Sequence, residues 1–88
     1  RMPVLTADNW QSWKTRFESL AVLQGVDKHL TDDPPTETDK QEAWKIKDKQ
    51  CMSLLNLSVG DSEMPHIMGL ETAKAMWTSL KDVKEPKG

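Results

Sequence analysis

The chain of 88 residues has one cysteine, no tyrosine, one phenylalanine and no long apolar run. Because Cys51 has no second cysteine as a partner, the sequence excludes an internal disulfide and a zinc site built on cysteines. No stretch approaches the roughly 18 apolar residues of a membrane span, and no basic start followed by an apolar core indicates a signal peptide. We therefore expect no membrane association and a cytoplasmic location, with the nucleus as the alternative.

The sequence also offers few groups that could carry out a reaction. His29 and His66 are the only histidines, and two histidines among scattered acidic residues are a weak signal for a metal site. Cys51 falls in the middle of a helical pattern, whereas reactive thiols favour electropositive, partly exposed positions. The four glycines are isolated, so there is no glycine-rich phosphate loop. We predict that the domain is not an enzyme and has no cofactor and no metal site.

The balance of charges argues against non-specific binding of nucleic acid. The chain has 12 Lys and Arg residues against 14 Asp and Glu residues, whereas binding through phosphates needs a basic surface. A tryptophan-rich helical DNA-binding domain of the Myb type is a distant alternative. The tryptophans here are separated by 3, 31 and 33 residues instead of evenly, and the last helix has lysines (Lys74, Lys81 and Lys84) but no arginine.

The stretch from Trp10 to Leu20 has the clearest helical pattern. Trp10, Trp13, Phe17 and Leu20 follow one another at intervals of three, four and three, which places them on one face of a helix. Such a face is either the centre of a core or an exposed binding surface. Complementary apolar faces elsewhere in the chain favour the core.

Two further stretches supply those faces. In the second helix Ala43, Ile46 and Leu57 widen the apolar side, and the last helix has apolar residues at i, i+3, i+4 and i+7 from Ala73. No alternation typical of strands is present. The sequence predicts an all-α fold. It consists of a small bundle of three main helices at about 9–24, 39–57 and 73–83, with two short helical turns at about 26–30 and 62–68.

Residues with short polar side chains mark the predicted helix starts. Asp8, with Gln11 three residues later, has the form of a capping box, and so has the segment from Thr38 to Gln41. Thr72 is expected to cap the last helix. We predict an extended N-terminal arm at 1–5, a single helical domain at 6–83 and a linker or tail at 84–88, and we expect the domain to be part of a longer protein.

The large apolar residues divide between a core and a candidate interface. Trp10, at the start of the first helix, is expected to keep an exposed edge. The apolar segment at 64–70, which includes Leu70, either covers the core or lies in an interface. The predicted core comprises Trp13, Phe17, Leu20, Trp44, Cys51, Leu55, Met76, Trp77 and Leu80. The candidate interface comprises Trp10, Met64, Pro65, Ile67 and Met68.

Three stretches resemble the N-terminal part of the Gag polyprotein of copia-type LTR retrotransposons. The first runs from Leu5 to Trp13 and has an Asn-Trp pair followed by a second Trp, and the second is Trp44 with the helix after it. The third, Thr72-Ala73-Lys74-Ala75-Met76-Trp77, is the most specific and looks like the family's TAKEAW signature, with Ala-Met where Glu-Ala is common. The order and spacing of the three also agree with the family.

The resemblance implies a helical, capsid-type N-terminal domain that self-associates, at least as a dimer, in a particle enclosing the element's RNA. The zinc knuckle that binds RNA in many such polyproteins is absent, so RNA contact is expected only through regions outside this chain. A host gene that captured a Gag is the alternative origin. The domain would then be an adaptor that binds a partner protein or peptide in a groove between helices.

Overall fold

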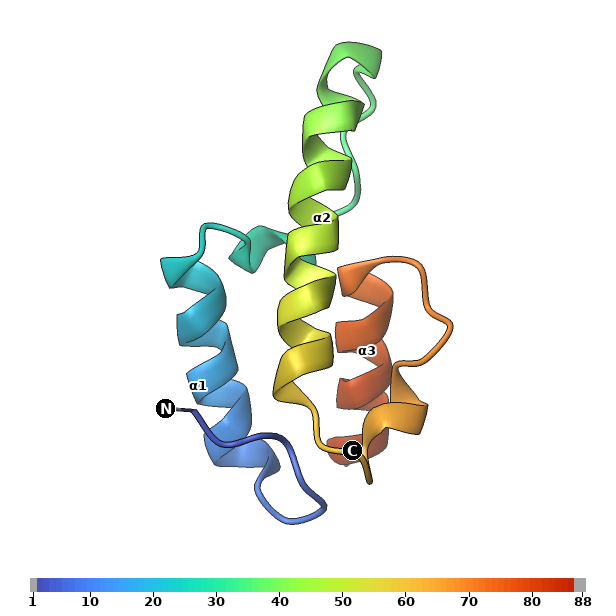
Figure 1. The fold of residues 1–88 in the computed structure, drawn as a ribbon. Coiled ribbons are helices and arrows are strands. Elements are labelled where there is room, and N and C mark those ends of the chain that lie inside the picture. Colours follow the sequence, from blue (N-terminus) through green and yellow to red (C-terminus); the bar gives the residue numbers. More distant parts are fainter. Residues whose placement is uncertain (1, 87–88) are drawn as a thin grey trace.

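The computed structural model describes residues 2–86, which form three α-helices and two short 3-10 turns (Figure 1). The elements follow the order α1 (Trp10–Leu23), η1 (Asp27–Leu30), α2 (Thr38–Ser58), η2 (Met64–His66) and α3 (Ala73–Lys84). No strand occurs among the described residues, apart from one isolated bridge. The all-α prediction is confirmed, and the predicted bounds of the three helices differ from the observed ones by one residue at most.

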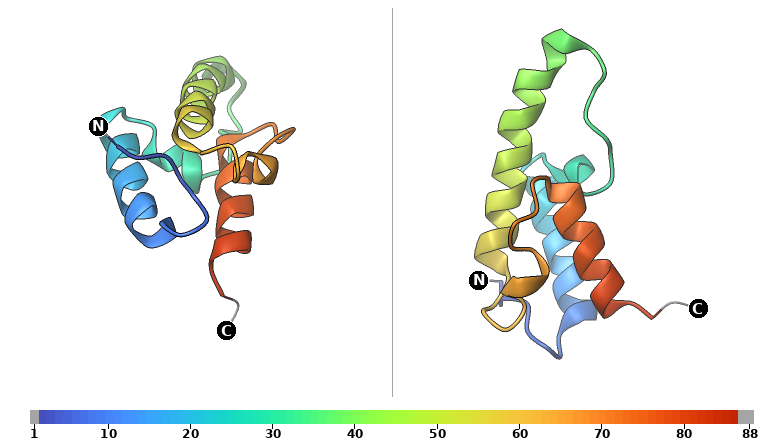
Figure 2. Two further views of the ribbon diagram at one scale, coloured as in Figure 1. Left: turned by 60° about the horizontal axis from the view of Figure 1, so that its bottom comes forward. Right: turned by 90° about the vertical axis from the view of Figure 1, so that its right-hand side faces the viewer.

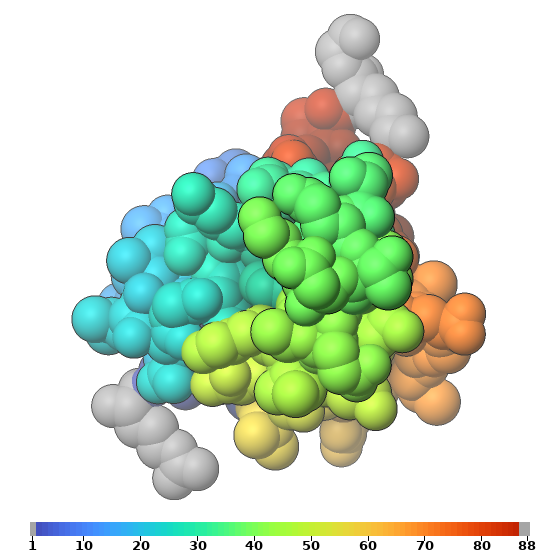
Figure 3. Space-filling model, turned by 90° about the horizontal axis from the view of Figure 1, so that it is seen from above, coloured from blue at the N-terminus to red at the C-terminus, as the bar shows by residue number. Residues whose placement is uncertain are grey.

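Helix α2 is the longest element, and its first half extends beyond the rest of the molecule (Figure 1). Helices α1 and α3 lie beside its second half, and α2 forms one edge of the molecule in the right-hand view of Figure 2. Seen from above, the start of α2 and the loop before it are the nearest part of the surface (Figure 3). Within residues 2–86, this arrangement leaves one long side of α2 without a covering element.

An aromatic cluster joins α1 to α3. The ring centroid of Trp77 lies 5.9 Å from that of Trp10, 6.0 Å from that of Trp13 and 5.6 Å from that of Phe17. All four side chains are buried, and Trp13 and Phe17 are completely so. Aromatic pairs at such distances contribute roughly 0.5–1.5 kcal/mol each beyond the burial of their area. The aromatic face of α1 therefore forms the centre of the core.

Trp13 also connects α1 to the end of α2. Its indole Nε1 donates a hydrogen bond of 2.9 Å to the carbonyl oxygen of Ser58, the last residue of α2. A helix leaves its last carbonyl groups without partners inside the helix. The buried indole N–H and the free carbonyl at this helix end thus satisfy each other.

The N-terminal arm is extended and packs onto the same helix end. The Leu5 amide donates to the Ser58 carbonyl at 2.8 Å, and the Gly60 amide donates to the Leu5 carbonyl at 2.9 Å. Leu5 is fully buried, so the last residue of the predicted arm belongs to the core. A Cβ atom at Gly60 would lie 2.6 Å from the Leu5 oxygen, which explains the glycine at this position. Residue 1 of the predicted arm lies outside the described residues.

The helix caps were predicted correctly at only one of three starts. The Thr72 hydroxyl accepts a hydrogen bond of 3.1 Å from the Ala75 amide, as predicted. The predicted capping boxes at Asp8 and at Thr38 are wrong, because α1 and α2 begin without a side-chain cap. Asn9 precedes α1, and its amide group bonds backwards instead, to the Thr6 amide and the Val4 carbonyl.

Most of the predicted core is buried. Seven residues are at most 3% exposed: Trp13, Phe17, Cys51, Leu55, Met76, Trp77 and Leu80. Leu20 is only half-buried and packs against the edge of the core. Trp44 is a correction, because it is also half-buried and packs on the His29 ring, with centroids 5.1 Å apart, away from the main core.

Two ion pairs hold the end of α3 in place. Lys84 pairs with the buried carboxylate of Glu63, next to η2. Glu85 accepts hydrogen bonds from Lys14 Nζ at 2.6 Å and from the Trp10 indole at 3.2 Å. The prediction that 84–88 is a tail is therefore wrong for Lys84 and Glu85, while residues 87–88 lie outside the described residues.

Both carboxylates have a lowered pKa. The hydrogen bond from Lys84 is the largest cause at Glu63, with further contributions from Ser62 and from the charges of Lys84 and His66. The hydrogen bond from Lys14 is the largest cause at Glu85. A carboxylate with a lowered pKa in the folded state stabilises the fold above its ordinary pKa, and this stabilisation disappears as the pH falls through the folded-state pKa.

Replacing Trp77 should be far more costly than replacing Trp44. Trp77→Ala removes a buried ring from the aromatic cluster, which typically costs about 3–5 kcal/mol. Trp44→Ala removes a half-buried ring and should cost about 1–2 kcal/mol. Urea unfolding followed by circular dichroism measures both losses. Equal losses of stability in the two variants would contradict the conclusion that Trp77 lies in the core and Trp44 does not.

Glu63→Gln should lower the free energy of unfolding at about pH 7, because it removes the partner of Lys84. The difference from the unchanged chain should shrink as the pH falls below the ordinary carboxyl pKa of 4.5. Glu18→Gln is the matched control, since Glu18 is exposed on α1 and has no ion-pair partner in the described chain. A difference that stays constant across this pH range would show that the Glu63 charge does not stabilise the fold.

Candidate protein interaction surface

A buried polar cluster connects η1, α2 and α3. Nδ1 of His29 and Oδ1 of Asp48 form a hydrogen bond of 3.1 Å, and both residues are buried. The other carboxylate oxygen, Oδ2, accepts from the Ala73 amide at 3.4 Å, at the N-terminus of α3. A carboxylate at a helix N-terminus also interacts favourably with the helix dipole. Both carboxylate oxygens of Asp48 thus have hydrogen-bond partners within the fold.

A largely apolar groove lies between α2 and the loop that precedes α3. Its volume is about 530 Å³. Trp44 and Met52 of α2 and Leu70 of the loop supply its large apolar side chains, and Lys45 and Lys49 of α2 also line it. We call it the Trp44 groove; its lining is Trp44, Lys45, Asp48, Lys49, Met52, Leu70, Glu71 and Thr72.

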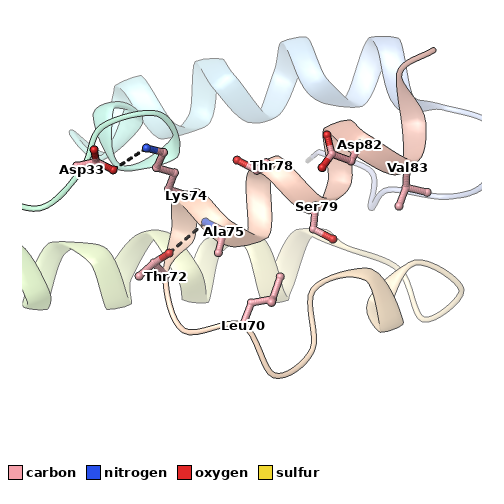
Figure 4. Close-up of a pocket in the computed structure, with 9 residues that line it drawn as sticks. All are labelled: Asp33, Leu70, Thr72, Lys74, Ala75, Thr78, Ser79, Asp82 and Val83. Carbon is pink, nitrogen blue, oxygen red and sulfur yellow. Dashed lines mark hydrogen bonds and ion pairs between the residues drawn. The ribbon is translucent and has the colours of Figure 1, made fainter. Parts of the chain in front are cut away.

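A second groove of about 540 Å³ lies on the other side of the same loop, against α3 (Figure 4). Leu70 and Val83 supply its apolar side chains, and Lys74 at one end pairs with Asp33 at 2.6 Å. This ion pair connects α3 to the loop that precedes α2. The polar residues Thr78 and Ser79 lie between, so this groove is less suited to an apolar partner than the Trp44 groove.

The uncovered side of α2 presents apolar residues to solvent. Ile46 is 65% exposed and Leu57 is 80% exposed. Between and beside them lie Ala43, Gln50 and Ser53, which are also exposed. We call these five residues the outer face of α2. The prediction that Ala43, Ile46 and Leu57 widen the buried side of this helix is wrong, because Asp48, Cys51 and Leu55 face the core instead.

The predicted interface residues do not form one surface. Trp10 is 7% exposed and Ile67 is 2% exposed, so both are corrections: they lie in the core. Met64 is half-buried and packs against the core. Pro65 is exposed, and Met68 is 68% exposed. Only these two could offer appreciable area to a partner.

Cys51 is poorly suited to react. It is fully buried, and burial, with smaller contributions from Asp48 and Asp27, raises the pKa of its thiol to about 12. The thiolate, which is the nucleophile, is therefore scarce at neutral pH. The thiol packs as an apolar group in the core.

The two histidines lie in separate clusters, His29 with Asp48 and His66 beside Glu63 at 3.7 Å. Within residues 2–86 no group of three or more His, Cys, Asp or Glu side chains could hold a metal ion. No helix of the described chain is long and apolar enough to cross a membrane.

The lysines of α3 are partly neutralised. Lys74 pairs with Asp33, and Lys84 pairs with Glu63. A helix that contacts DNA phosphates needs its cations free. This pairing weakens the distant alternative of a DNA-binding helix.

Sequence reasoning missed the residues that now define the candidate surface. Met52 is in no predicted site, and Leu70 is predicted only as part of the apolar segment that covers the core or lies in an interface. Ile46 and Leu57 are predicted on the wrong side of α2. The spacing of Ala43, Ile46, Gln50, Ser53 and Leu57, at steps of three, four, three and four, was a usable signal. It was masked because the apolar residues of α2 occur on two sides of the helix.

Comparison with known proteins gives the family. The family model described as the gag-polypeptide of LTR copia-type matches residues 13–87. The retrovirus-related Pol polyprotein from transposon TNT 1-94 of Nicotiana tabacum is 29% identical over 77 residues, which are 86% of this chain. The matched part is 6% of the length of that polyprotein. No solved structure matches the chain significantly. The chain therefore belongs to the copia-type LTR retrotransposon Gag family, as the resemblance in its sequence indicates.

Proposed function

We propose that this domain is a structural, non-catalytic part of Gag that self-associates during assembly of a retrotransposon particle. The observation that carries the proposal is the exposure of Ile46 and Leu57 on the side of α2 that no other element covers. Large apolar side chains on an uncovered helix face are typical of protein–protein contacts. The family supplies the context, because Gag polypeptides build particles from many copies of one chain.

We propose that this domain provides protein–protein contacts and that other regions of Gag bind the RNA. The chain has 12 Lys and Arg residues against 14 Asp and Glu residues, and two lysines of α3 are paired with carboxylates. We therefore assign RNA binding to regions outside this chain. The proposed location is the cytoplasm, with the nucleus as the alternative.

An adaptor role is the second candidate, and the Trp44 groove favours it. A groove with Trp44, Met52 and Leu70 as walls could hold an apolar segment of a partner protein or peptide. In this case the domain would come from a host gene that captured a Gag. Self-association would use the outer face of α2 and the adaptor role would use the Trp44 groove, so substitutions on the two surfaces should distinguish the two functions.

Self-association should be visible as a dependence on concentration. We expect the weight-average mass of the chain in sedimentation equilibrium to rise from that of a monomer toward at least that of a dimer as protein concentration increases. The variant Leu70→Ser changes the wall of the Trp44 groove and should leave this rise unchanged. A mass that stays monomeric at every concentration would contradict self-association of this domain and favour the adaptor role.

A further inference from the structure

We infer that two copies of the domain pair through the outer face of α2, with the two helices parallel and in register. This inference rests on the proposed function, and it names the surface and its occupant, a second copy of the same chain. The five residues of the outer face (Ala43, Ile46, Gln50, Ser53 and Leu57) define it.

The spacing of the outer face is that of a coiled-coil seam. Steps of three, four, three and four place the five residues at alternating a and d positions of two heptads, from Ala43 at a to Leu57 at a. A helix turns by about 100° per residue, so the centre of this face lies about 160° from the centre of the buried face formed by Trp44, Asp48, Cys51, Met52 and Leu55. Two copies joined at this seam would place α1 and α3 of each copy on the side of α2 that points away from the other copy (Figure 2).

The residue types along the seam suit close pairing. Ile46 and Leu57 provide apolar area near its two ends, and both are mostly exposed in the single chain. Ala43 and Ser53 are small and allow the two backbones to approach. Gln50 lies in the middle, where its amide can donate to and accept from the amide of the second copy. A single polar layer of this kind specifies register at some cost in stability.

The charges beside the seam favour the parallel orientation. Glu42 lies just before Ala43, at a g position, and Lys47 lies just after Ile46, at an e position. Lys47 is five residues after Glu42. In a parallel pair this spacing brings Glu42 of each copy to Lys47 of the other, which gives two equivalent ion pairs. Neither residue has an ion-pair partner within residues 2–86, so both are available.

The antiparallel alternative lacks this complementarity. In the antiparallel register that sets Ile46 against Leu57 of the second copy, Glu42 lies beyond Ser58, the last residue of the other α2, and so has no helical residue opposite it. The helix α2 is also already formed by the fold of each domain, so pairing does not have to order it first.

A charge exchange tests the pairing. In sedimentation equilibrium of the 88-residue chain, Glu42→Lys and Lys47→Glu should each weaken dimerisation by about fivefold or more, because each places like charges across both contacts. The double variant Glu42→Lys with Lys47→Glu should restore the dissociation constant to within about twofold of the unchanged chain. Leu57→Asp should abolish dimerisation, whereas Leu23→Asp, at an exposed leucine of α1, should not change it.

Cysteine cross-linking tests the orientation separately. Ala43→Cys and Leu57→Cys lie at opposite ends of the seam, and a parallel pair brings each new thiol to the same position of the second copy. Each variant alone should form a disulfide-linked dimer when incubated with oxidised glutathione, while Leu23→Cys should not. The native Cys51 is buried and does not interfere in a folded chain. Circular dichroism confirms that each variant folds.

The outcomes separate this inference from the proposed function. Loss of dimer in the single charge variants, rescue in the double variant and same-position cross-links support parallel pairing through α2. A dimer that is insensitive to the charge variants and to Leu57→Asp overturns the α2 surface but leaves self-association intact. Cross-links only in a mixture of Ile46→Cys with Leu57→Cys, the pair that the antiparallel register sets opposite each other, overturn the parallel orientation. A chain that never dimerises overturns both the inference and the proposed function.

Discussion

The packing of Trp77 against the aromatic side of α1 is the contact on which the rest of the structure depends. The ring centroids of Trp10, Trp13 and Phe17 each lie within about 6 Å of that of Trp77, so one residue of α3 contacts all three aromatic residues of α1. Through Trp13 the cluster also reaches the end of α2, where Ser58 accepts its indole hydrogen bond. A chain of 88 residues can bury only a limited share of its surface, so a few large rings must supply much of its stability.

Because most of the aromatic residues lie in the core, the large apolar side chains on the surface are aliphatic residues and methionine. Polar groups that lie inside are occupied, as with Asp48, which accepts hydrogen bonds from His29 and Ala73, and Glu63, which pairs with Lys84. The surfaces open to partners include the outer face of α2 and the grooves beside Leu70. These exposed apolar residues support the proposed contact between protein chains, and the chain belongs to a Gag family.

The helices and most of the core could be predicted from the sequence, because each apolar stripe has a clear helical period and three such stripes can cover one another. Which side of α2 is buried could not be predicted, because Ile46 and Leu57 are as apolar as Leu55. Only the packing of α1 and α3 shows which side is buried. Trp10 and Ile67 were misplaced for a related reason. Glu85, distant in sequence, covers the edge of Trp10, and the turn η2 points Ile67 inward.

The central claim is that the domain associates with itself through the outer face of α2. A series of two-dimensional NMR spectra of labelled protein, recorded on dilution, tests it most directly. The account predicts that the resonances of Ile46, Gln50 and Leu57 shift with concentration, while those of Leu23 and Met68, which are equally exposed, stay in place. Shifts confined to Met52 and Leu70 in the Trp44 groove, with the α2 face unchanged, would contradict it.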